Sequence, residues 1–212
     1  MPNSAAIIAH DHAIVAAVNA LRQGQIVVYP TETFYGLAAD PFSPDAMDRL
    51  FALKGRDSAK TVALIAPDAA SAFALASDVP AIARRLSDRF WPGPLTLVLA
   101  ARIGLHDSLI GPDGGVGVRV SPHSIASALA AGLGHPITAT SANLAGEPPA
   151  TTVAAARAAF SDRVSVYLDG GELTATTPST IVVCDHNGWR VIRAGAIATD
   201  QIIATLDATE PR

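Results

Sequence analysis

The amino-acid sequence predicts a mixed α/β fold. Segments whose apolar residues recur with helical spacing alternate with short apolar runs that are typical of buried strands. Two such runs, residues 179–185 and 189–193, are joined by a segment that contains Asn187-Gly188, a strong β-hairpin signal. The hairpin requires antiparallel pairing and the helices between other strands allow parallel crossovers, so we expect a mixed α/β sheet.

A helix followed by a buried strand opens the chain. Apolar residues recur with helical spacing over residues 14–21 and stop at Gly24, which is suited to a helix end. Residues 25–30, QIVVYP, then form a strand. The same criteria predict strands at 61–66, 94–101 and 115–120 and helices at 79–90 and 121–134.

A second helix has a well-defined start. Ser43 is suited to cap its N-terminus, and Pro44 is suited to its first turn. Apolar residues between Met47 and Phe51 then fall on one face together with Lys54. Lys54 is therefore expected at the C-terminal end of this helix.

The last third of the chain contains a loop, a hairpin and two helices. The Pro and Gly content of residues 144–152 excludes regular structure, whereas residues 153–160 and 199–206 are expected to be helical. No linker divides the sequence. The 212 residues, of which 50% are hydrophobic, are therefore expected to form a single domain spanning residues 1–212.

Charge and cysteine content restrict the class of protein. The formal net charge of −4 excludes a generally basic nucleic-acid-binding surface, although a local basic cavity stays possible. The N-terminus lacks a basic segment, and its apolar run is shorter than the roughly 18 residues of a membrane span. The single cysteine, Cys184, is expected to be a buried thiol. These features predict a cytoplasmic protein without a membrane segment.

Common nucleotide, metal and hydrolase signatures are missing. The sequence contains neither a P-loop nor a dinucleotide-binding G-x-G-x-x-G after a strand. Its six histidines are scattered, so we expect no histidine metal site. It also lacks the G-x-S-x-G pattern of α/β-hydrolases.

Four polar stretches interrupt apolar surroundings. They are residues 29–40, 53–60 and 138–149, and residues 179–180 taken together with Arg193. The first places residues 31–33, Thr-Glu-Thr, after a strand, where open α/β sheets bind ligands. The second gathers Lys54, Arg56 and Lys60, and a guanidinium is suited to bidentate phosphate contacts.

Each stretch also has a purely structural interpretation. Helix C-termini favour cations, so Lys54 and Arg56 could be solvated capping residues. Ser and Thr at strand ends often form turns. Arg119, by contrast, lies inside the apolar strand 115–120, where a charge is costly unless it is paired or binds a ligand. The combination of the four stretches favours a ligand site.

Taken in order, these stretches resemble the threonylcarbamoyl-AMP synthase family, also called the YrdC-like family. The similarity extends over residues 27–40, 50–60, 90–99, 115–120, 138–149, 178–183 and 191–197. The resemblance implies a twisted α/β sheet of the α+β type around a large basic cavity. It also implies a cytosolic enzyme that makes threonylcarbamoyl-AMP and pyrophosphate from L-threonine, bicarbonate and ATP, with Mg²⁺ assisting. The product would serve the downstream tRNA threonylcarbamoyl-transferase machinery, with at most a weak contact to tRNA itself.

The resemblance also implies roles for particular residues. Lys54 and Arg56 correspond to a K-x-R element, and Ser141 and Asn143 correspond to an S-x-N element, both of them catalytic. The ATP contacts would be Arg56, Lys60, Gly115, Ser141, Pro149 and Arg193. The threonine contacts would be Thr33, Arg119, Ala139 and Ser179. No protein ligand for a metal is implied.

The sequence departs from the family pattern at two positions. Asp57 follows Arg56 where many members have a proline. Ile65 stands where many members have a histidine, and it matches shorter relatives with an aliphatic residue there. Longer relatives carry a second domain, and the chain ends at Arg212, so the single-domain form is expected.

Other functions are compatible with the same fold. YrdC-like paralogues of uncertain activity lack the K-x-R and S-x-N elements, and related domains process carbamoyl phosphate in hydrogenase maturation. The presence of both elements favours the synthase. An RNA-binding module is disfavoured by the acidic net charge and the scarcity of aromatic residues near the cations. An inactive scaffold for the downstream machinery is a third alternative.

Overall fold

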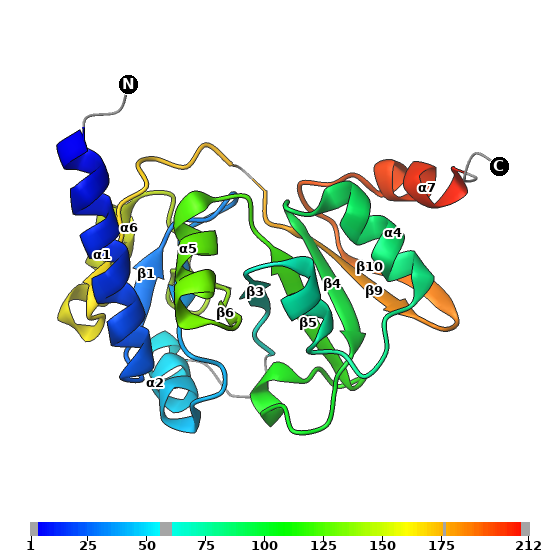
Figure 1. Ribbon diagram of the computed structural model, residues 1–212, viewed down its shortest axis with the longest axis horizontal. Coiled ribbons are helices and arrows are strands. Elements are labelled where there is room, and N and C mark those ends of the chain that lie inside the picture. Colours follow the sequence, from blue (N-terminus) through cyan, green and yellow to red (C-terminus); the bar gives the residue numbers. More distant parts are fainter. Residues whose placement is uncertain (1–3, 56–60, 176, 209–212) are drawn as a thin grey trace.

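The computed structural model describes residues 4–55, 61–175 and 177–208. They form two mixed β-sheets with helices packed around them (Figure 1). The predicted mixed α/β class is confirmed. The expectation of one sheet is wrong, because the strands divide into a four-stranded and a six-stranded sheet.

The sequence predictions can be compared with the elements of the described residues. The helices are α1 Ser4–Arg22, α2 Pro44–Lys54, α3 Ala69–Phe73, α4 Ala81–Phe90, α5 Ser124–Leu133, α6 Val153–Phe160 and α7 Thr199–Asp207, with short 3₁₀ turns at Asp107–Leu109 and Ser161–Arg163. The strands are β1 Val27–Tyr29, β2 Gly36–Ala38, β3 Leu64–Ala66, β4 Leu95–Ala100, β5 Gly115–Val120, β6 Ile137–Thr138, β7 Thr140–Ser141, β8 Val166–Tyr167, β9 Thr180–Asp185 and β10 Gly188–Arg193. Every predicted helix and strand is present, and α3, β2, β6, β7 and β8 are additional.

The two sheets differ in size but share a mixed pattern. The smaller sheet has the order β7-β2-β1-β8, in which β1 pairs antiparallel with β2 and parallel with β8. The larger sheet has the order β10-β9-β4-β5-β3-β6. In it β4 runs parallel to β9 and β3 parallel to β5, while β9 and β10 form the predicted antiparallel hairpin. Asp185 pairs with Gly188 in the hairpin, so its loop residues are His186 and Asn187.

The chain passes from one sheet to the other within residues 137–141. β6 pairs with β3 in the larger sheet, and β7 pairs with β2 in the smaller one. Ala139 lies between them and donates its backbone N–H to the Ala63 carbonyl at 2.7 Å. The chain thus links the two sheets through this short segment, and residues of both sheets line a common cavity.

Helices cover the sheets through apolar faces. α1 packs against α5, where Leu21 and Leu129 are fully buried in one apolar group. α4 and α7 lie together over the larger sheet (Figure 1). α2 begins as predicted, since the Ser43 hydroxyl accepts from the Ala46 N–H at 3.4 Å. Among the described residues, no helix has both the length and the apolar character needed to cross a membrane.

Candidate active site

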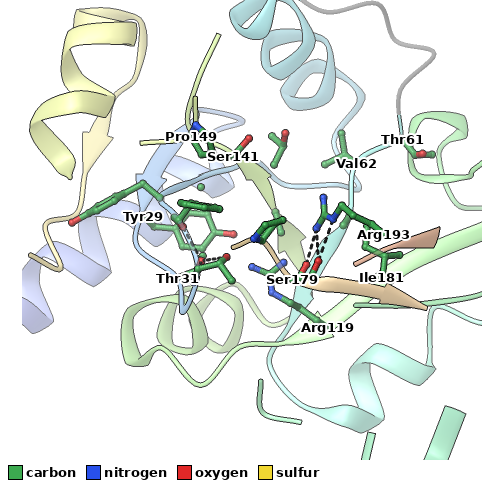
Figure 2. A pocket seen from close by; sticks show the side chains of 18 residues that line it. Tyr29, Thr31, Thr61, Val62, Arg119, Ser141, Pro149, Ser179, Ile181 and Arg193 are labelled. Atoms are coloured by element: carbon green, nitrogen blue, oxygen red, sulfur yellow. Dashed lines mark hydrogen bonds between the residues drawn. The ribbon is translucent and has the colours of Figure 1, made fainter. Parts of the chain in front are cut away.

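A cavity of about 560 Å³ is lined by residues from both sheets. Figure 2 shows its wall, in which side chains from the β1–β2 loop face others from the larger sheet. Many of the sequence-predicted site residues lie in this wall. They are Thr33, Arg119, Ala139, Ser141, Pro149, Ser179 and Arg193. The structure therefore brings together residues that are up to 160 positions apart in the sequence.

A tight turn at the end of β1 orients the buried Thr33. The Thr31 hydroxyl donates to the Phe34 carbonyl at 2.7 Å and accepts from the Thr33 N–H at 3.1 Å. The two threonine hydroxyls are 3.1 Å apart. Such side-chain-to-backbone bonds replace strand pairing locally, so the chain turns and Thr33 faces the cavity.

Arg119 is paired, as a buried charge in an apolar strand should be. Its Nε donates to Glu32 Oε1 at 2.7 Å, and both side chains are more than 90% buried. The other carboxylate oxygen of Glu32 accepts from the Ser121 hydroxyl. The buried pair joins the β1–β2 loop to β5, and Arg119 lies in the cavity wall.

Arg193 and Ser179 form a second polar contact in the wall. Arg193 donates from Nη2 to the Ser179 carbonyl at 2.8 Å and to the Ser179 hydroxyl at 2.9 Å. The Ser179 hydroxyl is also 2.9 Å from the Thr96 hydroxyl. Burial lowers the pKa of Arg193, and the nearby positive charge of Arg119 lowers it further. Two arginines thus face the same cavity (Figure 2).

Gly195 allows Arg193 to reach Ser179. A Cβ atom at Gly195 would lie 2.3 Å from the Pro178 carbonyl oxygen and 2.6 Å from the Thr180 nitrogen. The segment after β10 therefore packs directly against the backbone that carries Ser179, which a larger residue would prevent.

Lys54 joins the end of α2 to the S-x-N element. Its Nζ donates to the Ser141 carbonyl at 2.6 Å and to Asn143 Oδ1 at 3.3 Å. The Ser141 hydroxyl donates to the same Asn143 oxygen at 2.5 Å, and Asn143 Nδ2 donates to the Glu147 carbonyl. Lys54 is only 5% exposed, so the interpretation as a solvated capping residue is wrong for it.

The predicted cation cluster is only partly described. Ser141 lines the cavity, whereas Lys54 and Asn143 do not line it and are joined to it through Ser141. Arg56 and Lys60, like Asp57, lie outside the described residues. The basic character of the whole cavity therefore stays a prediction.

Comparisons with known proteins agree with this arrangement. A family model for Sua5, YciO and YrdC proteins, described as "Telomere recombination", matches residues 19–195. The chain belongs to the Sua5/YciO/YrdC family. It is 37% identical to a putative threonylcarbamoyl-AMP synthase of Mycobacterium tuberculosis over 91% of this chain and 88% of that protein. It is 41% identical to the threonylcarbamoyl-AMP synthase of Chromohalobacter salexigens over 79% of this chain and 90% of the other.

A solved structure gives the same result for the fold. The structure of P. abyssi Sua5 complexed with L-threonine superimposes with a TM-score of 0.87 at 32% identity. The match covers 92% of this chain and 57% of the P. abyssi protein, so the present chain spans little more than half of that relative.

Gly115 and Ile65 also lie outside the main cavity. Gly115 lines a neighbouring cavity of about 300 Å³, which shares Val62 and Ile181 with the first. Ile65, at the position where many members have a histidine, is fully buried in β3 opposite Arg119 and does not reach the wall.

Sequence reasoning did not assign roles to Tyr35 and Glu32. The Tyr35 hydroxyl donates to the Gly171 carbonyl at 2.7 Å and accepts from the Gly170 N–H at 2.9 Å, which fixes the segment leaving β8 beside the cavity. Glu32 holds Arg119. The signal for Glu32 was present, because a buried arginine requires a buried acid and Glu32 stands between two threonines after an apolar strand.

Proposed function

We propose that this protein is an L-threonylcarbamoyladenylate synthase, which converts L-threonine, bicarbonate and ATP into threonylcarbamoyl-AMP and pyrophosphate. One observation carries the proposal beyond family membership. The cavity wall combines Thr33, Arg119 and Ser179 with Ser141, whose carbonyl accepts from Lys54, so groups suited to an amino acid and to phosphate meet in one space.

The amino-acid half of the site would bind the substrate through its carboxylate. Arg119 offers a planar guanidinium to that group, and the hydroxyls of Thr33 and Ser179 provide further polar contacts. The backbone near Ala139 completes this half. The amino group of threonine would then lie in the cavity, where it can react with bicarbonate.

The nucleotide half would bind ATP through cations and hydroxyl groups. Arg56, Lys60 and Arg193 would contact phosphates, with Ser141 and Asn143 oriented by Lys54. Pro149 and the backbone near Gly115 would border the nucleotide. Fixed donors of this kind stabilise the charge that develops on the phosphate oxygens and on the leaving pyrophosphate.

The reaction needs two bond-forming steps. The threonine amine attacks the carbon of bicarbonate, and loss of water gives a carbamate. A carbamate oxygen then attacks the α-phosphorus of ATP, and the bond from that phosphorus to the bridging oxygen breaks to release pyrophosphate. Holding the reactants together can lower such barriers by roughly 7 to 11 kcal/mol at the favourable limit, so no covalent protein intermediate is required.

Mg²⁺ would enter this site as part of the MgATP substrate. Within residues 4–55, 61–175 and 177–208, no group of three His, Cys, Asp or Glu side chains is placed to hold a metal ion. Mg²⁺ typically retains waters and binds through substrate phosphates, which is consistent with such a site. We also propose that the product serves the downstream tRNA threonylcarbamoyl-transferase machinery. In the same proposal the protein makes at most a weak contact with tRNA and is located in the cytoplasm.

Pyrophosphate release provides the test. Purified protein is supplied with MgATP, with and without L-threonine and bicarbonate, beside the double variant Lys54→Ala, Arg56→Ala. We expect release that requires both co-substrates and is lost in the variant. Folded wild-type protein that binds ATP but releases no pyrophosphate would contradict the proposal.

Other measurements distinguish the alternatives. An RNA-binding module would bind RNA with an affinity that falls steeply with salt, without any nucleotide turnover. A scaffold would retain its place in the tRNA-modifying assembly when ATP chemistry is lost. The 37–41% identity to proteins named as synthases favours the enzyme over both.

A further inference from the structure

Glu32 does not line the cavity, but it contacts Arg119, which does. It belongs to the loop between β1 of the smaller sheet and β2, and its side chain extends to β5 of the larger sheet. Only 9% of that side chain is exposed. A carboxylate in such a place is costly to bury, so its contacts indicate what it does.

Both carboxylate oxygens of Glu32 are occupied. Oε1 accepts from Arg119 Nε at 2.7 Å, and Oε2 accepts from the Ser121 hydroxyl. The Ser121 oxygen also accepts from the His123 N–H at 3.2 Å, just before the start of α5. Glu32 is thereby fixed at two points, and it cannot itself turn toward a ligand without losing them.

The contact with Arg119 uses the inner nitrogen of the guanidinium. Because the guanidinium is planar and rigid, a bond at Nε restricts the positions that the two terminal nitrogens can take. The described residues provide no other hydrogen bond to Arg119. Its terminal nitrogens are thus left for the cavity that Arg119 lines (Figure 2).

The same carboxylate also positions the opposite side of the amino-acid half. Thr33 follows Glu32 directly in the chain and enters the cavity from the β1–β2 loop. Anchoring Glu32 on β5 therefore sets the spacing between Thr33 and Arg119, which come from different sheets. A ligand carboxylate meeting Arg119 would find the donor already oriented, which reduces the entropy lost on binding.

We infer that Glu32 is a positioning residue for the amino-acid substrate, which it serves by orienting Arg119 and by setting the distance from Arg119 to Thr33. This inference rests on the proposed function for the identity of the ligand, L-threonine. Substitutions at position 32 can separate the role of the negative charge from the role of orienting Arg119. Glutamine there still accepts from Arg119 Nε through its amide oxygen and still reaches Ser121, whereas alanine does neither.

The test compares Glu32→Ala, Glu32→Gln and Ser121→Ala with wild type. L-threonine binding is measured by calorimetry, and KM and kcat are measured by pyrophosphate release. For Glu32→Ala we expect a roughly tenfold or greater rise in both the Kd and the KM for threonine, from the lost orientation of a charged hydrogen-bond donor. We expect kcat at saturating threonine and the KM for ATP to change less than about threefold.

The conservative variants separate orientation from simple loss of stability. Glu32→Gln should restore the threonine Kd to within about threefold of wild type, and Ser121→Ala should give an intermediate value. Asp78→Ala removes an exposed acid that pairs with His186 outside both cavities and serves as the matched control. A threonine Kd in Glu32→Ala equal to that of wild type would overturn the inference, as would a Glu32→Gln variant as impaired as Glu32→Ala.

Three further outcomes are distinct. If Glu32→Ala does not fold, Ser121→Ala decides, and an unchanged threonine Kd in that variant overturns the inference. If wild type binds threonine but releases no pyrophosphate, the proposed synthase activity fails while the calorimetric comparison still tests Glu32. Wild type that binds no threonine overturns both.

Discussion

The two halves of the cavity are held together in different ways. In the half proposed to bind the amino acid, Arg119 and Ser179 each have a partner from another segment, which is Glu32 for Arg119 and Arg193 for Ser179. In the half proposed to bind the nucleotide, Ser141 and Asn143 are joined to α2 by the ammonium group of Lys54. Several contacts hold the first half, so loss of its individual residues should have effects of different size. The second half should depend strongly on Lys54.

The largest effect should come from Arg119→Lys. Lysine keeps a positive charge beside Glu32 but has no fork for a carboxylate, so the buried acid stays paired while bidentate recognition is lost. We expect the KM for threonine to rise roughly 100-fold, in line with the loss of strong charged hydrogen bonds. Steady-state kinetics measures this. A KM within threefold of wild type would remove Arg119 from the amino-acid half.

Lys54→Met tests whether the nucleotide half depends on one residue. The apolar side chain fills much of the same space but cannot donate to the Ser141 carbonyl or to Asn143. We expect the KM for ATP to rise roughly 10- to 30-fold through the loss of a charged donor, with the threonine Kd unchanged. Calorimetry with threonine and kinetics with varied ATP separate the two. If threonine binding weakens equally, the halves are not independent.

Elements that local sequence determines could be predicted, whereas those that depend on tertiary pairing could not. Helices and strands with clear periodicity, such as α2 with its Ser43 cap, were predicted because local pattern and capping residues determine them. The crossing at Ala139 and the two-residue strands around it have too few residues to show a pattern, so the division into two sheets could not be foreseen.

The same limit applies to the candidate site, where single residues could be predicted from local sequence but their partners could not. Arg119 was identified because a charge in an apolar strand needs a partner, but its partner Glu32 is 87 residues away and only the fold brings the two together. The position of Lys54 at a helix end was predicted, yet its contact with residues 141 and 143 depends on tertiary structure. Sequence therefore identifies functional side chains more readily than the residues that orient them.

Ser179→Ala should have a smaller effect because the amino-acid half has overlapping supports. Arg193 also donates to the Ser179 carbonyl, from Nε at 3.1 Å and from Nη2 at 2.8 Å, and the substitution keeps both bonds. We expect kcat/KM for threonine to fall roughly fivefold, as for one neutral hydrogen bond. Measurement of the same constant in Thr96→Ala, which loses only the hydroxyl contact to Ser179, provides the comparison. A loss above 100-fold in Ser179→Ala would show that the supports do not overlap.

Cys184 offers a reporter for the sheet that carries Arg119 and Arg193. It is 1% exposed in β9, where burial, and to a lesser degree the charge of Asp185, raises the pKa of its thiol to about 12. The folded thiol therefore stays protonated at pH 8 and should react with a disulfide reagent far more slowly than in denaturant. Because the pKa is higher in the folded state, Cys184 should reduce stability only as the pH rises from about 9 toward 12.

The reporter also distinguishes the two halves. Lys54→Met should leave the thiol reaction rate at pH 8 within about twofold of wild type, because Lys54 supports residues 141 and 143 of the other half. Reaction of Cys184 with the reagent, followed by absorbance in wild type and in Lys54→Met, measures this. A tenfold faster reaction in the variant would mean that loosening the nucleotide half opens the larger sheet, and the two halves would then have to be treated as one cooperative unit.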